Sequence, residues 1–405
     1  MKKIILLQNH PVFTLDISKI ANPEKYELHL ISTEICVEQL KHRDQHDFFE
    51  SINVSNNFEL LDLIGIVGAI TNNKSVDFDI VTSSEQAMDI CGKLRVYFNL
   101  DHDDLERYAN KITMKKSLSK SDVRCPKYVK FDDAEFGINP VKYLENLSKE
   151  IPFPMFAKPI NQAGSIGTAL IKNHEELIEW CSGKDSEKSF EIDEYIEGTL
   201  FHCDAFIKNN EIFYTQVSMC LNPCFDFTLG KPVGSITLPA DSEDFIRIKE
   251  FNENALRAMV MPTNAITHLE VIKKNDGELV FVEVAARPPA SMVPRTYLKH
   301  LGVSIMEAHI LLQIDDDYVP NINYGPYSAF VIYPKLKGQV SKFNEPVISS
   351  LFEVTHNVKL GDELTAAEKV RDIAAAILFS NENPDELMRD YLSLNHFNLY
   401  EVRAN

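Results

Sequence analysis

The chain has 405 residues, and 44% of them are hydrophobic, as in an ordinary globular protein. This length exceeds what one hydrophobic core usually supports, so it predicts roughly two or three domains. The 60 acidic residues outnumber the 41 basic ones and leave a formal charge of −19, which repels nucleic-acid backbones and anionic membranes. We therefore expect no nucleic-acid partner.

The sequence also argues against a membrane protein. No segment offers the roughly 18 consecutive apolar residues of a membrane span. The opening stretch MKKIILLQNHPVF has an apolar run, but Gln8, Asn9 and Pro11 end it early, which favours a first buried strand over a secretion signal. The seven cysteines are scattered without a CxxC pair, as in reduced proteins. The expected location is the cytoplasm, with no membrane partner.

The first 95 residues alternate short apolar strands with helical stretches, which predicts a parallel α/β layer. The expected strands and helices of this layer are Lys3–Leu7, Glu27–Ser32, Phe58–Ile70 (helix), Phe78–Val81 and Ser83–Phe98 (helix). Residues 100–121 are highly charged and also have helical spacing. A strand at Tyr128–Phe131 and helix-like spacing over 132–150 follow.

The stretch KPINQAGSIG, residues 158–167, places a lysine before a loop with two glycines. It joins an expected strand, Met155–Lys158, to an antiparallel partner, Thr168–Lys172. In the functional interpretation, the Lys158 ammonium contacts nucleotide phosphates and backbone N–H groups of Gly164–Gly167 close over them as a mobile lid. The alternative is a surface lysine at a strand edge before an ordinary turn.

The middle and the end of the chain mix strands with single helices. The expected elements are a helix at His174–Cys181, strands at Phe190–Ile196, Leu200–Ile207 and Ile212–Met219, and helices at 243–259 and Ala366–Ala376. Residues 222–240 contain three prolines and two glycines and are expected to form the longest irregular stretch there. Long loops of that kind often bind ligands.

A second hairpin carries two acidic residues and an arginine in otherwise apolar strands. Its expected strands are Thr267–Lys273 and Leu279–Ala285, joined by a turn with the sequence NDG. The tight turn makes Glu270 and Glu283 neighbours, and two facing carboxylates repel each other unless a cation lies between them. Mg²⁺ binds such carboxylates, and Arg287 beyond the strand can grip a phosphate or carboxylate. The alternative is a solvated face on which Arg287 pairs with one acid.

Four segments of the sequence resemble motifs of the ATP-grasp ligases and occur in the same order as in that family. The four matching motifs over about residues 100–310 are Asn110-Lys111, Lys158 with Ala163–Gly167, EIDEYIEG at Glu191–Gly198, and Glu270, Glu283 and Arg287. The resemblance implies an α/β protein with α+β lobes, the ATP-grasp fold and a Rossmann-like N-terminal domain. The implied divisions are the N-terminal domain at 1–95, linker helices and lid at 96–185, a central subdomain at 186–325 and a C-terminal subdomain at 326–405.

The resemblance also implies a role for each matching residue. The nucleotide-binding set would be Lys111, Lys158, Gly164, Ser165, Gly167, Asp193, Glu194, Tyr195, Ile196, Glu197 and His202. The ligands for Mg²⁺, or Mn²⁺, would be Glu270 and Glu283, and the catalytic residues would be Arg287 and Lys158. The candidate substrate contacts are Asp226, His268, Arg287 and Arg295, although a surface salt bridge explains Arg295 equally well. Ala285 stands where many members have asparagine, so the number of metal ions stays open.

Three segments narrow the resemblance to the L-amino-acid ligases, the dipeptide synthases similar to the bacilysin- and rhizocticin-pathway enzymes. These segments are SEQAMDICGKLRVYFNL, EYIEGTLFHCDAF and FVEVAARPPAS. The resemblance implies small-molecule amino-acid substrates, with arginine or another basic residue favoured if Asp226 lines the first pocket. It leaves open a ligase for a non-amino-acid acid or amine, a non-catalytic nucleotide-binding regulator, and a homodimer.

Overall fold

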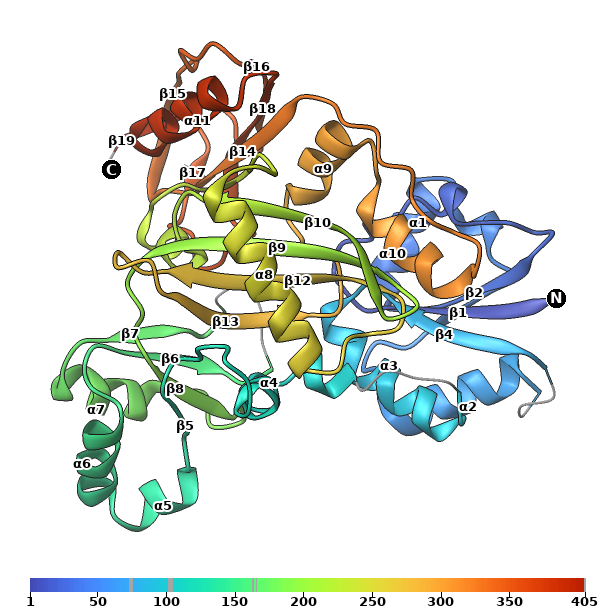
Figure 1. Cartoon of the computed structure of the whole chain (residues 1–405), viewed down its shortest axis with the longest axis horizontal. Coiled ribbons are helices and arrows are strands. Elements are labelled where there is room, and N and C mark those ends of the chain that lie inside the picture. Colours follow the sequence, from blue (N-terminus) through green and yellow to red (C-terminus); the bar gives the residue numbers. More distant parts are fainter. Residues whose placement is uncertain (73–75, 101–104, 162–163, 165, 404–405) are drawn as a thin grey trace.

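The computed structural model describes residues 1–72, 76–100, 105–161, 164 and 166–403. These residues form two sheets of four strands, one of eight and one of three (Figure 1). The prediction of an α/β protein with distinct lobes is confirmed. Among the described residues, no helix has both the length and the apolar character that crossing a membrane requires.

The N-terminal sheet is parallel throughout, in the order β3-β2-β1-β4, as predicted for a Rossmann-like layer. In its inner strand β1, every residue from Ile4 to Gln8 is buried, as expected for a parallel sheet that is covered on both faces. The elements are β1 (Lys2–Gln8), β2 (Tyr26–Ser32), β3 (Ser51–Val54), β4 (Phe78–Thr82), α1 (Glu34–His42), α2 (Leu60–Ile70) and α3 (Glu85–Tyr97), with short 3₁₀ helices at Ile17–Lys19 and His46–Phe48. Strand β3 was not predicted, because it is short and only half-buried.

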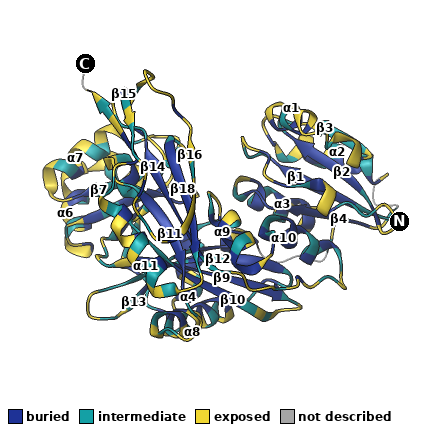
Figure 2. Cartoon of the chain, turned by 90° about the horizontal axis from the view of Figure 1, so that it is seen from above, coloured by how far each residue is buried: buried dark blue, intermediate teal, exposed yellow. Residues whose placement is uncertain are grey.

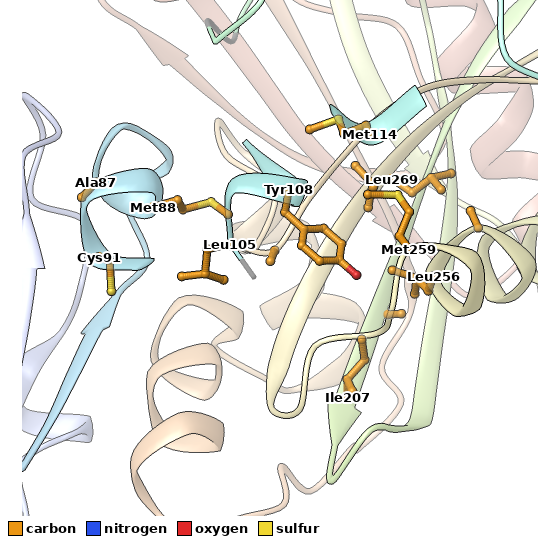
Figure 3. Packing of buried hydrophobic residues seen from close by; sticks show 14 of the residues in the cluster. Ala87, Met88, Cys91, Leu105, Tyr108, Met114, Ile207, Leu256, Met259 and Leu269 are labelled. Atoms are coloured by element: carbon orange, nitrogen blue, oxygen red, sulfur yellow. The ribbon is translucent and has the colours of Figure 1, made fainter. Parts of the chain in front are cut away.

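Residues 105–118 form two helices instead of the single long one that residues 100–121 predicted. The 3₁₀ helix η3 (Leu105–Tyr108) ends before Asn110, whose side-chain oxygen caps α4 (Lys111–Leu118) by accepting from the N–H groups of Ile112 and Thr113 at 3.0 and 3.1 Å. Residues 101–104 lie outside the described part. Figure 3 shows Leu105 and Tyr108 between α3 side chains and Met259, so this segment joins the N-terminal core to the central one.

The second four-stranded sheet is antiparallel, in the order β5-β8-β6-β7. Its register places Lys158 of β6 opposite Glu191 of β8. The elements are β5 (Tyr128–Lys130), β6 (Met155–Pro159), β7 (Ala169–Ile171), β8 (Phe190–Glu194), α5 (Asp133–Ile138), α6 (Pro140–Glu150) and α7 (His174–Gly183). Strand β8 ends two residues earlier than predicted.

The eight-stranded sheet forms the centre of the molecule, and its strands run antiparallel in the order β13-β12-β9-β10-β11-β14-β18-β16. Helix α8 lies across β9 and β10 (Figure 1), and the inner strands are largely buried (Figure 2). The elements are β9 (Thr199–Lys208), β10 (Glu211–Cys220), η4 (Cys224–Leu229), β11 (Val233–Thr237), α8 (Glu243–Ala258), β12 (Ala265–Lys273), β13 (Leu279–Ala285), α9 (Val293–Leu301) and α10 (Ile305–Ile314). The expected loop at 222–240 therefore contains a short helix and an inner strand.

The C-terminal part completes the central sheet and adds a small sheet, β17-β15-β19. The elements are β14 (Tyr327–Pro334), β15 (Gly338–Phe343), β16 (Leu351–His356), β17 (Glu363–Leu364), β18 (Ile373–Asn381), α11 (Pro384–Ser393), the 3₁₀ helix Leu394–His396 and β19 (Tyr400–Arg403). The predicted helix Ala366–Ala376 is wrong. Its alanines continue into β18, which is buried between two neighbouring strands, so sheet pairing overrides their helix propensity.

His309 of α10 connects the N-terminal sheet to the central sheet. Its Nδ1 accepts from the N–H of Ile266 at 3.0 Å, and its Nε2 lies 3.2 Å from the carbonyl oxygen of Thr82 and donates to it. Burial, followed by repulsion from Arg95 and Arg287, lowers the pKa of His309 to about 4. The ring is therefore neutral in the folded protein near neutral pH.

This low pKa predicts a pH-dependent loss of stability. An unfolded histidine takes up a proton below pH 6.5 and buried His309 only near pH 4, so its contribution is complete above pH 6.5 and disappears as the pH falls towards 4. We expect His309→Gln to remove about 3 kcal/mol of the pH dependence of the unfolding free energy over this window. Urea unfolding of both proteins at pH 7 and 4.5 measures it, and parallel pH curves would contradict the prediction.

Candidate active site

Two carboxylates face each other on neighbouring strands of the central sheet. The register of β12 and β13 places Glu270 directly opposite Glu283, as the alternation of the hairpin predicted. A β-bulge follows, because the next pair is Val271 with Phe281. Both acidic side chains remain partly accessible, at 24% and 21% of their surface. Neither side chain is therefore fully buried.

Lys111 lies against this pair. Its ammonium is 2.9 Å from Oε2 of Glu283, and the cap at Asn110 fixes it at the first position of α4. Burial alone would raise the pKa of Glu283, but Lys111 and Lys158 overcome it and lower the pKa to about 2. Glu283 is therefore ionised at neutral pH. Two accessible carboxylates, one of them held ionised, are a donor set that suits a hard divalent cation.

A buried cluster of two lysines and two acids lies beside this pair, within the second four-stranded sheet and α4. Lys115 Nζ is 2.6 Å from Asp193 Oδ1 and 3.0 Å from Glu191 Oε1. Lys158 Nζ is 3.0 Å from Asp193 Oδ2 and 3.3 Å from Glu191 Oε1. Burial lowers the pKa of Lys115, whereas the two acids outweigh burial at Lys158 and raise its pKa. Lys158 thus stays cationic.

Sequence reasoning missed Lys115. Lys111 and Lys115 are separated by one helical turn, and Glu191 and Asp193 by two strand positions, so each pair lies on one face of its element. That spacing was visible in the sequence. What the sequence did not indicate is that Asp193, assigned to the nucleotide-binding strand, uses both carboxylate oxygens to hold lysines.

Arg287 follows β13 and is held by a residue of the N-terminal lobe. Its Nε and Nη2 both donate to Oε2 of Glu85, with the Nε at 3.0 Å, and its Nη1 donates to the carbonyl oxygen of Pro288 at 2.8 Å. Burial opposes the charge of the guanidinium, but Glu85 raises the pKa of Arg287 above its usual value. The alternative considered from the sequence was a solvated face on which Arg287 pairs with Glu270 or Glu283. Its ion-pair partner in the structure is Glu85, which the sequence did not indicate.

A second polar network is centred on Asp204 of β9. His202 Nδ1 donates to one carboxylate oxygen at 2.8 Å, His268 Nδ1 donates to the other at 2.6 Å, and the Tyr297 hydroxyl also donates to Asp204. Burial would raise the pKa of Asp204, but the two histidines hold it well below its usual range. Asp204 in turn outweighs the burial of His268 and raises the pKa of His268 to about 9.

His268 connects this network to the facing pair of acids, because it lies next to Glu270. His268 Nε2 is 3.8 Å from Glu270 Oε1, and the other ring nitrogen of His202 is 2.7 Å from the Ser235 hydroxyl. His268 is therefore cationic at neutral pH beside Glu270. His202, which was expected in the nucleotide-binding set, lies beside Asp204 and opposite Glu270 of the neighbouring strand.

Residues 193–197 of the expected nucleotide-binding set lie at the end of β8, an inner strand of the second sheet, and just beyond it. The N–H of Tyr195 donates to the carbonyl oxygen of Pro154 at 3.1 Å, and its ring is exposed over 40% of its surface. Glu194 forms an ion pair with Arg124, Ile196 is half-buried and Glu197 is exposed. Glu194 and Glu197 therefore have other surroundings than the facing pair Glu270 and Glu283.

The glycine loop is only partly described. Gly164 and Gly167 have φ angles of 67° and 74°, a conformation that favours glycine, and at Gly164 an added Cβ would meet nothing within 4 Å. Ser165, which was assigned to the nucleotide, lies outside the described residues, as do Gln162 and Ala163. The expected lid motion of this loop therefore stays a prediction.

The last two candidate substrate residues each pair with another charged side chain. Asp226 of η4 pairs with Lys231 at 3.0 Å and is close enough to Tyr195 to contribute, after burial, to a raised pKa of that phenol. Arg295 of α9 pairs with Glu353 at 3.1 Å, and both side chains are half exposed. Glu353 belongs to β16, at the opposite edge of the central sheet from β13. This favours the surface salt bridge for Arg295.

Comparison with known proteins agrees with the motifs. The model of the family described as "D-ala D-ala ligase C-terminus" matches residues 118–307. An L-arginine-specific L-amino acid ligase of Bacillus subtilis is 23% identical over 326 residues, which cover 76% of this chain and 76% of that protein. A D-alanine–D-alanine ligase of Bacillus velezensis is 26% identical over 208 residues, covering 48% of this chain and 56% of that protein.

Solved structures match over the full length. The crystal structure of an L-amino acid ligase from Bacillus licheniformis has a TM-score of 0.70 at 14% identity and covers 100% of this chain and 99% of its own. That of N5-carboxyaminoimidazole ribonucleotide synthetase from Thermotoga maritima has a TM-score of 0.63 at 15% identity, with 100% of both chains covered. The chain therefore has the ATP-grasp fold, matches the D-ala D-ala ligase C-terminus family over residues 118–307, and is similar to the L-amino acid ligases.

Proposed function

We propose that the protein is an ATP-dependent ligase that joins two L-amino acids into a dipeptide through an aminoacyl phosphate. The facing pair Glu270 and Glu283, with Lys111 2.9 Å from Glu283 and Arg287 at the end of the same strand, supports this proposal most strongly. Transfer of a phosphoryl group needs positioning and neutralisation of charge, and this set of residues supplies both. The similarity to L-amino acid ligases favours amino acids as substrates.

In the proposed first step, a carboxylate oxygen of one amino acid attacks the γ-phosphorus of ATP. The bond from that phosphorus to the bridging oxygen breaks, and ADP leaves with the electron pair. Lys111 and Lys158 would hold phosphate oxygens, and the Arg287 guanidinium would stabilise the charge on the transferred group. Glu270 and Glu283 would hold Mg²⁺, or Mn²⁺, which would supply positive charge to neutralise the phosphate oxygens.

In the proposed second step, the amine nitrogen of the other amino acid attacks the carbonyl carbon of the aminoacyl phosphate. The bond from this carbon to the phosphate oxygen breaks, phosphate leaves, and the nitrogen loses a proton. Water must be kept from the intermediate, and we assign that role to residues 96–185, in which the loop after Lys158 would close as a lid. The proposal includes the domain boundaries after residues 95, 185 and 325.

The test measures phosphate release from ATP with Mg²⁺ and pools of amino acids, with mass spectrometry of the products. Release that requires two amino acids and yields a dipeptide supports the proposal. Release that requires one amino acid and a different amine or acid would move the protein to another class of ligase. Nucleotide binding without release from any pool would indicate a regulator, for which Ala285 in place of a metal-binding asparagine is the only present argument.

For the first substrate, we propose a basic amino acid such as arginine, supported by the name of the Bacillus subtilis relative and by the acid Asp226. We expect Asp226→Asn to reduce kcat/KM for arginine about tenfold or more, because a lost charge-assisted hydrogen bond costs about 1.5–3 kcal/mol. Scanning twenty amino acids with both proteins checks this. An apolar preference in the unmodified enzyme, or an unchanged arginine rate, would refute the acidic pocket.

A further inference from the structure

The Arg287 guanidinium does not use all of its N–H groups within the described chain. Of its five N–H groups, those of Nε and one of Nη2 go to a single oxygen of Glu85, and one of Nη1 goes to the carbonyl of Pro288. Arg287 makes no other hydrogen bond within the described chain. One N–H group on each of Nη1 and Nη2 therefore remains for an anion such as a phosphate.

Glu85 comes from the N-terminal lobe, which carries none of the four motifs. It is the first residue of α3, where the partial positive charge of the helix favours a carboxylate. Its partner is 202 positions further along the chain, and the Arg287 side chain is only 11% exposed. The ion pair is therefore a shielded link between two lobes rather than a solvated surface pair.

Arg287 also has competing partners. After Glu85, the carboxylates that interact most strongly with it are Glu283 and then Glu270. Those two acids form the proposed cation site, and a guanidinium that turned towards them would neutralise the charge that attracts the metal. Glu85, and neither of these two acids, accepts from the Nε and Nη2 groups of Arg287.

We propose that Glu85 is a positioning residue for Arg287: it directs the guanidinium to the transferred phosphoryl group and prevents it from competing with Mg²⁺ for Glu270 and Glu283. This inference rests on the proposed function. It gives the N-terminal lobe a part in the chemistry, since the correct placement of α3 becomes a condition for an active Arg287. No direct contact of Glu85 with a substrate is required.

The test compares Glu85→Gln with Asp89→Asn, a matched loss of charge one turn later on the same helix, where Asp89 pairs only with exposed Lys93 at 2.6 Å. For Glu85→Gln we expect kcat of the full-length enzyme to fall about 10- to 100-fold, the usual effect of losing a residue that orients a functional group. The Mg²⁺ concentration for half-maximal rate should rise several-fold, while KM for ATP at saturating Mg²⁺ changes little. Asp89→Asn should match the unmodified enzyme in all three.

A readout without turnover separates this inference from the proposed function. Titration calorimetry with ADP and Mg²⁺ should show weaker metal-dependent binding for Glu85→Gln, and the loss should disappear in a Glu85→Gln/Arg287→Met double variant, which has no guanidinium to compete. If no amino acid supports phosphate release but this pattern holds, only the proposed function fails.

Three results would overturn the inference. They are equal kcat and Mg²⁺ dependence for Glu85→Gln and Asp89→Asn, a rise in kcat for Glu85→Gln, and a binding defect that persists in the double variant. Glu85→Asp keeps the charge on a shorter side chain and should lie between Glu85→Gln and the unmodified enzyme. It also serves as the test variant if Glu85→Gln has a lower melting temperature.

Discussion

Replacing Glu283 with glutamine is expected to slow ATP-dependent phosphate release by about 10²- to 10⁴-fold. A metal ion contributes several kcal/mol of charge stabilisation to phosphoryl transfer, and each 1.36 kcal/mol corresponds to a tenfold change in rate. Glu283 is the better choice of the two facing acids, because Lys111 and Lys158 hold its pKa at about 2 against burial, so it offers a full negative charge. Glutamine keeps the shape and removes the charge.

Initial rates over a range of Mg²⁺ concentrations measure this effect. The control is Glu278→Gln beside the turn of the same hairpin, where Glu278 is half exposed, pairs with Lys274 at 2.8 Å and lies 3.7 Å from Arg124. It should leave the rate and the Mg²⁺ dependence unchanged. Equal rates for the two variants would remove Glu283 from the cation site, and the metal-binding role would then have to be assigned to other residues.

The parts of the site that the sequence predicted are those set by local geometry. Glu270 and Glu283 belong to one hairpin with a short turn, so strand alternation alone brings them together. Lys158 and Asp193 also lie on adjacent strands of one small sheet, although their ion pair was not predicted. In each case the deciding interaction lies within one or two neighbouring elements.

The parts that the sequence did not predict depend on packing between lobes. Nothing near Glu85 in the sequence indicates that it meets Arg287, because that contact follows from how α3 docks beside the central sheet. Asp204 likewise looks like an ordinary polar residue of a strand until β12 and α9 bring His268 and Tyr297 to it. The wrong helix at Ala366–Ala376 has the same cause, since strand pairing of β18 is decided by its neighbours.

Replacing Lys115 with methionine should have the largest effect on stability. Lys115 is fully buried and lies 2.6 Å from Asp193 and 3.0 Å from Glu191, so its loss leaves two buried carboxylates to share Lys158. Removing one partner from a buried ion pair costs about 3–5 kcal/mol, because the remaining charge is left uncompensated. We expect a decrease of that size in the free energy of unfolding, measured by urea titration.

The control is Lys116→Met, the next residue of the same helix, whose exposed side chain should tolerate the change within about 0.5 kcal/mol. A smaller loss for Lys115→Met than for Lys116→Met would contradict the buried cluster. A double variant, Lys115→Met with Asp193→Asn, should recover part of the lost stability, because it removes a lysine and a carboxylate together and leaves Lys158 paired with Glu191.

Lys115→Met also tests how Lys158 binds the phosphates of ATP. With Lys115 present, two lysines balance Glu191 and Asp193, and Lys158 can turn towards phosphate oxygens without leaving either acid uncompensated. Without Lys115, Lys158 is the only cation that these two carboxylates share, so binding phosphate costs more. KM for ATP should therefore rise in Lys115→Met more than in Lys116→Met, at a temperature where both remain folded. An unchanged KM for ATP would limit Lys115 to a structural role. It would also mean that Lys158 binds ATP while it stays paired with Glu191 and Asp193.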